Sequence, residues 1–292
     1  MKRFADYNPA AVFLYFIAVS LAAMLCMNPV VLIISLIGSL TFFFVSGQTA
    51  KPREQALCFV FFLLISLINP IFNHNGATVL FILNNNPVTL EAVLYGVAAG
   101  VMIISIIFWF RSFSAIMTSD KLLYVFGSLL PKTALILSMT LRYIPLFKRQ
   151  MKKTVAAQKA LGLAQDDNII DRTKGGLRVF SAMVTWGLEN GIITADSMCA
   201  RGYGTGKRSR FALYRLRRSD VLLLAAVLAP AAAVFLGMAS GAVEYDYYPY
   251  FSVSELSLSG TAAYAAYALL AFLPSVIEAE GRLKWKYLQS KI

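Results

Sequence analysis

The sequence has few charged residues and few of the side chains that bind metals. Of its 292 residues, 14% are charged, 58% are apolar, and only one is a histidine. A single histidine excludes a metal site built from several histidines. The three cysteines are odd in number and scattered, so they predict neither a disulfide framework nor a CxxC metal site. They are Cys26, Cys58 and Cys199. A chain this apolar is expected to be an integral membrane protein.

The apolar residues form six runs, each long enough to cross about 30 Å of hydrocarbon as a helix. The runs are 10–27, 30–46, 56–72, 92–110, 221–240 and 261–277. Asn28-Pro29 predicts a tight turn between the first two runs, because proline breaks a helix. Lys2 and Arg3 before the first run would suit a signal peptide, but the second run follows so closely that we expect an uncleaved anchor. The runs contain essentially no charged residue, which disfavours an ion-coupled carrier acting alone.

Basic residues outnumber acidic residues by 27 to 15, which gives a formal net charge of +12. Three segments contain no lysine or arginine: 28–30, 73–91 and 241–260. They lie between the first and second, the third and fourth, and the fifth and sixth runs. Because basic residues favour the cytoplasmic side, we expect six spans with both termini inside, and no nucleic-acid partner is needed to explain the charge. His74 and Glu91, in or beside an outer segment, are expected on the exposed surface. Residues 69–76 are expected to form a turn above the membrane.

About 110 residues, 111–220, separate the fourth and fifth runs and are expected on the cytoplasmic side. Within them, residues 122–141 are apolar enough to suggest another span. Their basic flanks and Pro131 instead favour a broken helix that lies at the membrane surface or packs on its neighbours. We therefore divide the chain into three parts. These are an N-terminal transmembrane bundle (1–121), an interfacial and cytoplasmic coupling region (122–219), and two C-terminal transmembrane helices with a basic tail (220–292).

Two amphipathic helices are predicted inside the coupling region. In the first, over 145–162, an apolar stripe recurs every fourth residue and Gly162 ends the helix. The second covers about 176–201, and Gly202 follows it where a left-handed residue would close a helix. Neither is apolar enough to be a span, so their apolar faces must be covered by each other, the bundle, lipid or a partner. The first stripe is Phe147, Met151 and Val155. The second is Leu177, Phe180, Val184, Leu188, Ile192 and Ala195, widened by Met183 and Trp186.

The sequence gives little support to an enzyme. Residues 201–208 lack the first glycine and the final serine or threonine of a phosphate-binding GxxxxGK[ST] loop. Asp166, Asp167 and Asp171 are similar to the paired carboxylates that hold Mg²⁺ and a diphosphate in membrane prenyl-transfer enzymes. Because no second aspartate-rich cluster completes a two-metal site, a solvated turn is the simpler interpretation. A membrane transferase that acts on a lipid diphosphate through these aspartates stays the alternative function.

Several segments resemble the transmembrane T component of energy-coupling factor (ECF) transporters, the EcfT or CbiQ-like family. The resemblance is carried by residues 69–76, 89–92, 95–96 and 141–145, and above all by 197–204, which read Ser-Met-Cys-Ala-Arg-Gly-Tyr-Gly, followed by 206–211. It implies a multi-pass protein of the cell membrane that is not itself an enzyme. Such a scaffold joins two cytoplasmic ABC ATPases to a small membrane S component that captures a vitamin or a trace metal ion. The chain would hold no cofactor, because ATP binds to the partner subunits.

The resemblance also implies where the partners bind. In that family, two coupling helices end in short Ala-Arg-Gly-like motifs that enter grooves on the two ATPases. Ala200, Arg201 and Gly202 match the second motif. Ala160, Leu161 and Gly162 occupy the first, with Leu161 where the family usually has arginine. The first contact would therefore be apolar, or Lys159 would supply its charge. No catalytic, substrate-binding or metal site is expected in this chain.

Overall fold

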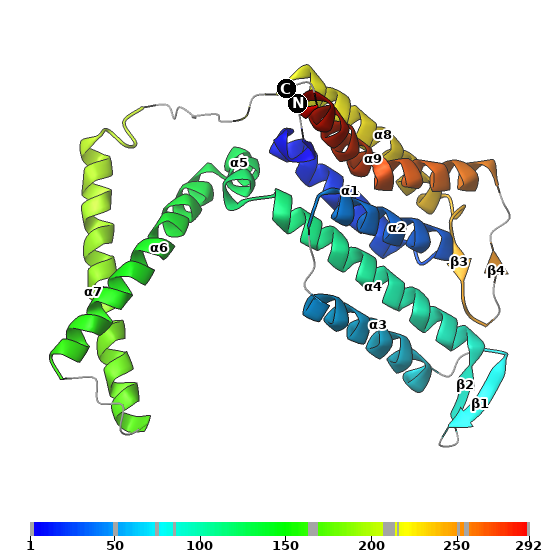
Figure 1. Ribbon diagram of the computed structural model, residues 1–292, viewed down its shortest axis with the longest axis horizontal. Coiled ribbons are helices and arrows are strands. Elements are labelled where there is room, and N and C mark those ends of the chain that lie inside the picture. The colour runs from blue at the N-terminus through cyan, green and yellow to red at the C-terminus, as the bar shows by residue number, and fades with distance from the viewer. Residues whose placement is uncertain are drawn as a thin grey trace. The chain divides into compact units, whose positions relative to one another are not determined.

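The computed structural model describes residues 3–48, 52–73, 76–83, 86–162, 169–206, 214, 216–249, 252–253 and 257–290. It consists of two compact units, Met1–Leu122 with Tyr214–Ile292, and Leu123–Leu213. The first unit contains α1 (Pro9–Leu25), α2 (Pro29–Val45), α3 (Pro52–Phe72), α4 (Leu90–Ile116), α8 (Arg218–Ala239) and α9 (Leu258–Gln289) (Figure 1). The second contains α6 (Pro131–Ala160) and α7 (Ile169–Ala200), and α5 (Ser119–Leu129) connects the two units.

The predicted membrane bundle is confirmed by the helices of the first unit. By length and composition, α3, α4, α8 and α9 are long and apolar enough to cross a membrane, and α1 and α2 are shorter apolar helices. Each of the six predicted runs therefore forms a helix. The turn predicted at Asn28-Pro29 is also confirmed, because the side chain of Asn28 accepts a hydrogen bond from the Val30 N–H and caps α2. Asn8 caps α1 through the Ala10 N–H in the same way.

Two short antiparallel ribbons, which the sequence pattern does not predict, join helices of the first unit. β1 (Val79–Leu83) pairs with β2 (Asn86–Thr89), and β3 (Tyr245–Asp246) pairs with β4 (Ser252–Val253). The expectation that Glu91 is a surface residue is wrong, because Glu91 is only 1% exposed. Its carboxylate accepts hydrogen bonds from the N–H and the hydroxyl of Thr78, which fixes the first ribbon to the start of α4. His74 lies outside the described residues.

The sequence predicts a turn over the segment 69–76, but the structure shows helix in its first half. Its first four residues form the last turn of α3, and Asn73 follows the helix. Pro70 lies inside α3 and is buried. The hydrogen bond that an internal proline removes kinks a helix without necessarily ending it. Residues 74 and 75 lie outside the described part of the chain.

Two glycines four residues apart attach α3 to α4. A Cβ atom on Gly96 would stand 2.6 Å from the carbonyl oxygen of Ser66, and one on Gly100 would stand 2.9 Å from Cδ2 of Phe62. Such small-xxx-small spacing lets helix backbones approach closely in membranes. Because Pro70 has no N–H to bond the Ser66 carbonyl, that oxygen is left for the close approach of α4. Only 6% of the most apolar stretch of α3 is buried, so these contacts hold an otherwise exposed helix.

One end of the first unit has an aromatic core built around Phe4, which is fully buried. Phe4 belongs to a short 3-10 helix, η1 (Phe4–Asp6), and its ring meets those of Tyr15 and Phe42 edge-on, with centroids 5.4 and 5.7 Å apart. Trp109 of α4 stacks on Phe42 at 6.2 Å. Phe4 thus packs against α1 and α2, and Trp109 of α4 extends the same aromatic core. Aromatic pairs in this geometry stabilise the fold by about 0.5–1.5 kcal/mol each beyond their burial.

The same N-terminal segment makes polar contacts at two points of the first unit, one just before the chain enters the second unit and one just after it returns. Before the exit, the ammonium group of Lys121 donates to the carbonyl oxygen of Ala5 at 2.7 Å. Burial lowers the pKa of Lys121, and the carboxylate of Asp6 opposes that shift. After the return, Asp220 of α8 accepts a hydrogen bond from the N–H of Asn8 at 3.4 Å. The segment is therefore part of the folded bundle rather than a free tail.

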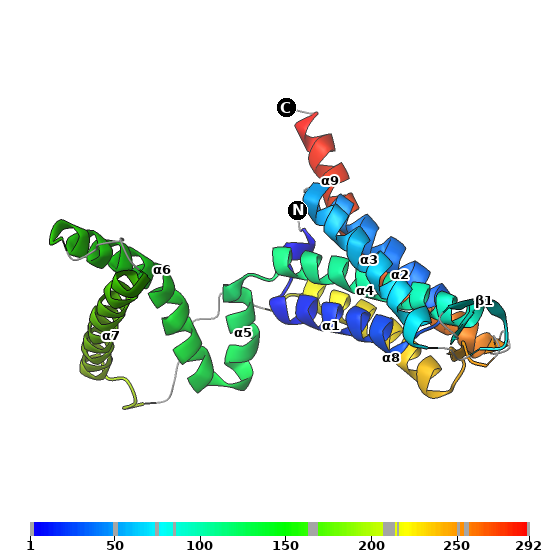
Figure 2. The same cartoon turned by 90° about the horizontal axis from the view of Figure 1, so that it is seen from below.

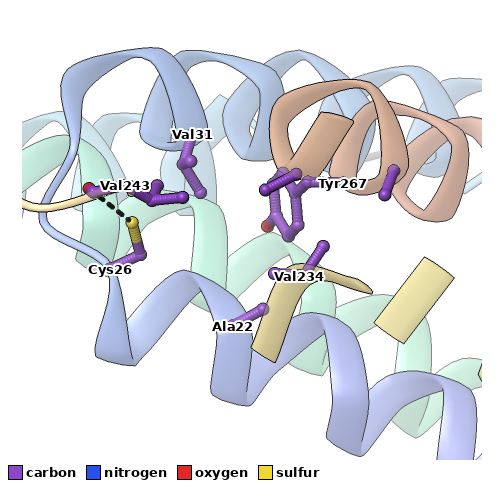
Figure 3. Close-up of a cluster of buried hydrophobic side chains, with 8 residues drawn as sticks. Ala22, Cys26, Val31, Val234, Val243 and Tyr267 are labelled. Atoms are coloured by element: carbon purple, nitrogen blue, oxygen red, sulfur yellow. Dashed lines mark hydrogen bonds between the residues drawn. The ribbon is translucent and has the colours of Figure 1, made fainter. Parts of the chain in front are cut away.

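A second apolar cluster joins α1, α2, α8 and α9 (Figure 3). Tyr267 of α9 is fully buried beside Val31 and Val234. The thiol of Cys26 is also buried here and lies 3.9 Å from the carbonyl oxygen of Val243, to which it donates. The first and last helices of the chain thus share one core, which is why α8 and α9 belong to the same unit as α1–α4.

Candidate functional site

α6 is one helix of 30 residues where the sequence predicts two separate elements. The predicted break at Pro131 is confirmed, because α5 ends at Leu129 and Pro131 is the first residue of α6. The predicted helix start at Pro145 is wrong, since Pro145 lies inside α6. An internal proline removes one backbone hydrogen bond and kinks a helix without necessarily ending it. That residues 122–141 lie at the membrane surface stays a prediction.

α7 also begins earlier than predicted, at Ile169 instead of about residue 176. Gly175 and Gly176 explain the difference, because two adjacent glycines weaken a helix by about 1 kcal/mol each without breaking it. A Cβ atom at either position would meet no atom within 4 Å, so neither glycine is needed for packing. The helix end at Ala200 agrees with the prediction to within one residue.

α6 and α7 cross where the ring of Phe147 lies against Gly187, and both views show the crossing (Figures 1 and 2). A Cβ atom at Gly187 would stand 2.9 Å from Cζ of Phe147. The same ring meets Trp186 edge-on at 5.1 Å. One turn earlier on α6, the hydroxyl of Tyr143 hydrogen-bonds that of Thr194 at 2.6 Å. The crossing thus combines a ring packed against a glycine, an aromatic pair and a polar contact.

The predicted apolar stripe of α7 is confirmed as an exposed surface of the second unit, with two exceptions. The exposed members are Leu177, Phe180, Val184, Leu188, Ile192 and Ala195. Met183 and Trp186, expected to widen this stripe, instead face α6. Met183 is 7% exposed and accepts a hydrogen bond at sulfur from Thr154, whereas Trp186 packs on Phe147. α7 therefore presents one apolar surface to α6 and a second that no described residue of the unit covers.

The predicted stripe of α6 is divided between two environments. Phe147 packs against α7, whereas Met151 is exposed and Val155 is half-buried. The four-residue spacing places these side chains close to one line along the helix, but α7 crosses that line at an angle and covers only the part near Phe147. The first helix therefore contributes one anchor residue to the crossing rather than a continuous apolar seam.

α7 ends in a Schellman motif in which Gly202 is the left-handed residue, with φ of 79°. The Gly202 N–H donates to the carbonyl of Cys199 at 2.9 Å, and the Tyr203 N–H donates to that of Met198 at 3.0 Å. The left-handed conformation predicted for Gly202 is confirmed. Arg201 is the capping residue between helix and glycine, and its side chain is exposed together with Ala200 and Gly202.

α6 also ends at a left-handed glycine, Gly162, whose φ is 70°; the residue that follows it lies outside the described part of the chain. The Gly162 N–H donates to the carbonyl of Lys159 at 3.1 Å, and Leu161 is the capping residue. Ala160, like Ala200 on α7, is the last helical residue and is exposed. The two ends therefore share a left-handed glycine, the hydrogen bond from its N–H to the carbonyl three residues earlier, and an alanine as the last helical residue. They differ in the capping side chain, which is a leucine with 72% of its surface exposed on α6 and an arginine on α7.

The two ends also lie equally far from the crossing. Leu161 follows Phe147 by 14 residues, and Arg201 follows Gly187 by 14 residues. At 1.5 Å per helical residue, each of these segments, which we call the arms, is about 21 Å long. The structure thus presents two arms of equal length that share one crossing and end in matching glycine caps.

The aspartates of the alternative transferase are only partly described. Asp171 lies in the first turn of α7, where a carboxylate complements the helix dipole. Asp166 and Asp167 lie outside the described residues, as do residues 207–211 after the second motif. Among the residues that the structure does describe, no group of three His, Cys, Asp or Glu side chains is placed to hold a metal ion.

Comparison with known proteins identifies the family. The family described as "CbiQ: Cobalt transport protein" matches residues 4–213, which include both arms. A relative from Listeria innocua serovar 6a, the "Energy-coupling factor transporter transmembrane protein EcfT", is 32% identical over 178 residues. This match covers 56% of the chain and 66% of the relative, so the chain spans just under two thirds of that protein's length. The chain therefore belongs to the CbiQ family and is a multi-pass membrane protein.

Proposed function

We propose that this chain is the transmembrane scaffold of an ECF-type importer for a vitamin or a trace metal ion. It links two cytoplasmic ATPases, which bind the ATP, to a substrate-binding S component in the membrane. The observation that carries the proposal is the pair of equal arms with matching, exposed ends. Two matching ends suit two related motor subunits better than one partner. The name of the Listeria relative, an energy-coupling factor transporter transmembrane protein, supports the same function.

The chemistry of the two ends suggests how they bind. Ala200 and Gly202 are small, so another protein can approach the α7 end closely and leave the guanidinium of Arg201 to pair with a carboxylate. The Schellman hydrogen bonds hold the backbone of this end, so little conformational entropy is lost on binding. At the α6 end, the exposed Leu161 takes the place of the arginine and enters an apolar pocket of the other ATPase.

Transmission of force depends on the crossing. When ATP closes the ATPase dimer, both ends move, and the contact between Phe147 and Gly187 keeps the two helices moving together. The exposed apolar stripe of α7 passes this movement to the S component, which then opens its substrate site to the cytoplasm. The stripe suits a partner that lies in or against the membrane, because its side chains are apolar and exposed in the described part of the second unit.

Arg201→Ala tests the proposal most directly. Removing one member of a buried interfacial charge pair costs about 2–5 kcal/mol, so at least tenfold less ATPase should co-purify with the variant, and substrate uptake should fall. Arg178→Ala is the matched control, because Arg178 is another exposed arginine of α7, far from the helix end. Undiminished co-purification and uptake in Arg201→Ala, with folding intact, would refute the proposed role of this end.

A further inference from the structure

α6 is far more basic than its partner helix. It carries seven lysines and arginines and no acidic residue, whereas α7 has three basic and three acidic residues. Neither the crossing with α7 nor the capped end of α6 uses this charge. A cytoplasmic position explains the basic excess of the whole chain, but it does not explain why the excess lies on α6 and not on α7. Its concentration on one helix favours a partner that carries many negative charges.

Four of these cations gather on the side of α6 that faces away from α7. We call them the basic face: Lys148, Arg149, Lys152 and Lys153. Their spacing places them on two successive turns, and helical geometry puts Tyr143, Phe147 and Thr154, which contact α7, on the opposite side. All four side chains are exposed, and within the described part of the chain none of them forms an ion pair. The basic face is therefore free to bind an external partner.

Exposed apolar side chains border the basic face along one edge. Ile144 and Met151 lie between it and the side that meets α7, and each has about half of its surface exposed. An acidic groove on a soluble protein would match the cations but would leave these two side chains unexplained. A lipid surface accounts for both features, because apolar groups enter the acyl boundary while lysine and arginine remain at the phosphates.

Chain connectivity keeps the start of α6 near the membrane. α4, a candidate span, ends at Ile116, and α6 begins at Pro131. Eleven of the residues between them form the helix α5, which is compact along the chain. With about 1.5 Å per helical residue and 3.4 Å for the others, the connection spans at most roughly 30 Å. This reach is shorter than α6 itself, which is about 45 Å long, so the first residue of α6 stays close enough to the membrane for α6 to lie along its surface.

We propose that the basic face of α6 binds the phosphate headgroups of anionic lipids on the cytoplasmic surface of the membrane. Ile144 and Met151 insert at the edge of the acyl region beside it. The proposal rests on the predicted cytoplasmic position of α6, and it stands whether or not the two ATPases bind as proposed above. Its consequence is that the anionic lipid content of the membrane sets how firmly one arm is held at the surface.

Limited proteolysis of the full chain, reconstituted without any ATPase, tests the proposal. Trypsin cuts after each cation of the basic face, and the cuts are quantified by mass spectrometry. In vesicles that contain about 30% phosphatidylglycerol, cleavage there should be about tenfold slower than in pure phosphatidylcholine, and about 0.5 M salt should abolish the protection. Cleavage after Arg172, Lys174 and Arg178 of α7 is the internal control. It normalises for vesicle orientation and should not depend on lipid charge.

A second measurement uses variants. The chain with all four cations of the basic face changed to glutamine should retain at least several-fold less phosphatidylglycerol after detergent extraction than the wild type. The matched control carries Arg172→Gln, Lys174→Gln and Arg178→Gln, and should retain the wild-type amount. Because all seven side chains are exposed, neither variant is expected to unfold.

Three outcomes would overturn the proposal. Equal normalised cleavage in both kinds of vesicle would show that the basic face does not bind anionic lipid. Protection by inorganic phosphate in pure phosphatidylcholine vesicles would identify a site for the free anion. Protection that appears only when the ATPases are added, in either lipid, would assign the basic face to an acidic protein surface. Since the main experiment contains no ATPase, its failure would leave the proposed coupling function untouched.

Discussion

The ring of Phe147 occupies the place where Gly187 would carry a side chain, with Cζ only 2.9 Å from the position of a Cβ atom. α6 thus contacts α7 at a position where α7 carries a glycine and has no side chain. Gly191, one turn further along α7, has no neighbouring atom within 4 Å of the same position. Both glycines lie in α7, but only Gly187 contacts α6, so the same substitution at Gly191 is a matched control.

Gly187→Leu is expected to separate the two helices at their crossing. The larger side chain must displace the ring of Phe147, and overpacking of this kind costs about 1–3 kcal/mol. Hydrogen exchange should therefore become faster in the amides near the crossing on both helices, and substrate uptake should fall. Gly191→Leu is the control and should leave exchange near the crossing unchanged. Similar behaviour of the two variants would contradict the packing described here.

Alanine in place of glycine should have opposite effects at a helix cap, Gly162, and inside a helix, at Gly176. Gly162→Ala forces a left-handed conformation on a residue with a Cβ atom, which costs about 1–2 kcal/mol. Because no atom lies within 4 Å of that position, the cost is conformational and not steric. Gly176→Ala, inside α7, should stabilise its helix by about 1 kcal/mol. Protection of the last-turn amides of α6 against hydrogen exchange should fall only in Gly162→Ala. A stabilised α6 end in that variant would exclude a left-handed cap.

Leu161→Arg gives the first helix end the same capping side chain as the second, where Arg201 lies. If the exposed leucine enters an apolar pocket, as proposed, burying an unpaired guanidinium there costs several kcal/mol and ATPase co-purification should fall at least tenfold. Leu161→Met keeps the apolar character and should retain binding. Stronger association of Leu161→Arg would instead indicate that the ATPase groove carries an acidic residue.

Gly96→Val should weaken the attachment of α3 to α4. Its side chain would meet the backbone oxygen of Ser66, which cannot move aside as a side chain can. We expect a loss of about 1–3 kcal/mol, measured as a lower thermal unfolding temperature in detergent. Leu94→Phe also enlarges a side chain of α4, but at an exposed position, and should have little effect. An unchanged unfolding temperature in Gly96→Val would mean that the close approach at Ser66 is not needed to hold α3.

The parts of this fold that are predictable from the sequence are those set by local properties. Unbroken apolar runs specify the membrane helices, and Gly162 and Gly202 specify helix ends because only glycine adopts a left-handed conformation at low cost. Pro145 misleads because one missing hydrogen bond can be tolerated within a long helix. A proline in the sequence indicates that one helical hydrogen bond is missing, but whether the helix continues depends on the stability of the turns on either side.

Tertiary contacts account for the other differences. Periodicity groups Trp186 with the apolar residues of α7 but does not reveal that it faces another helix, since an apolar side chain suits a protein neighbour and a lipid equally well. Glu91 is buried because Thr78, on the far side of a ribbon that no pattern predicts, supplies its hydrogen bonds. The equal lengths of the arms emerge only when the crossing point is known.

That equality has a mechanical consequence. If α6 and α7 pivot as one body about the contact between Phe147 and Gly187, both tips have the same radius of swing. A turn of about 10° would displace each tip by roughly 4 Å, given arms of about 21 Å. Two motor subunits that close symmetrically would then deliver equal strokes, and neither would strain against the other. A one-turn deletion in a single arm would shorten its radius by about 5 Å and destroy that balance while leaving both end motifs intact.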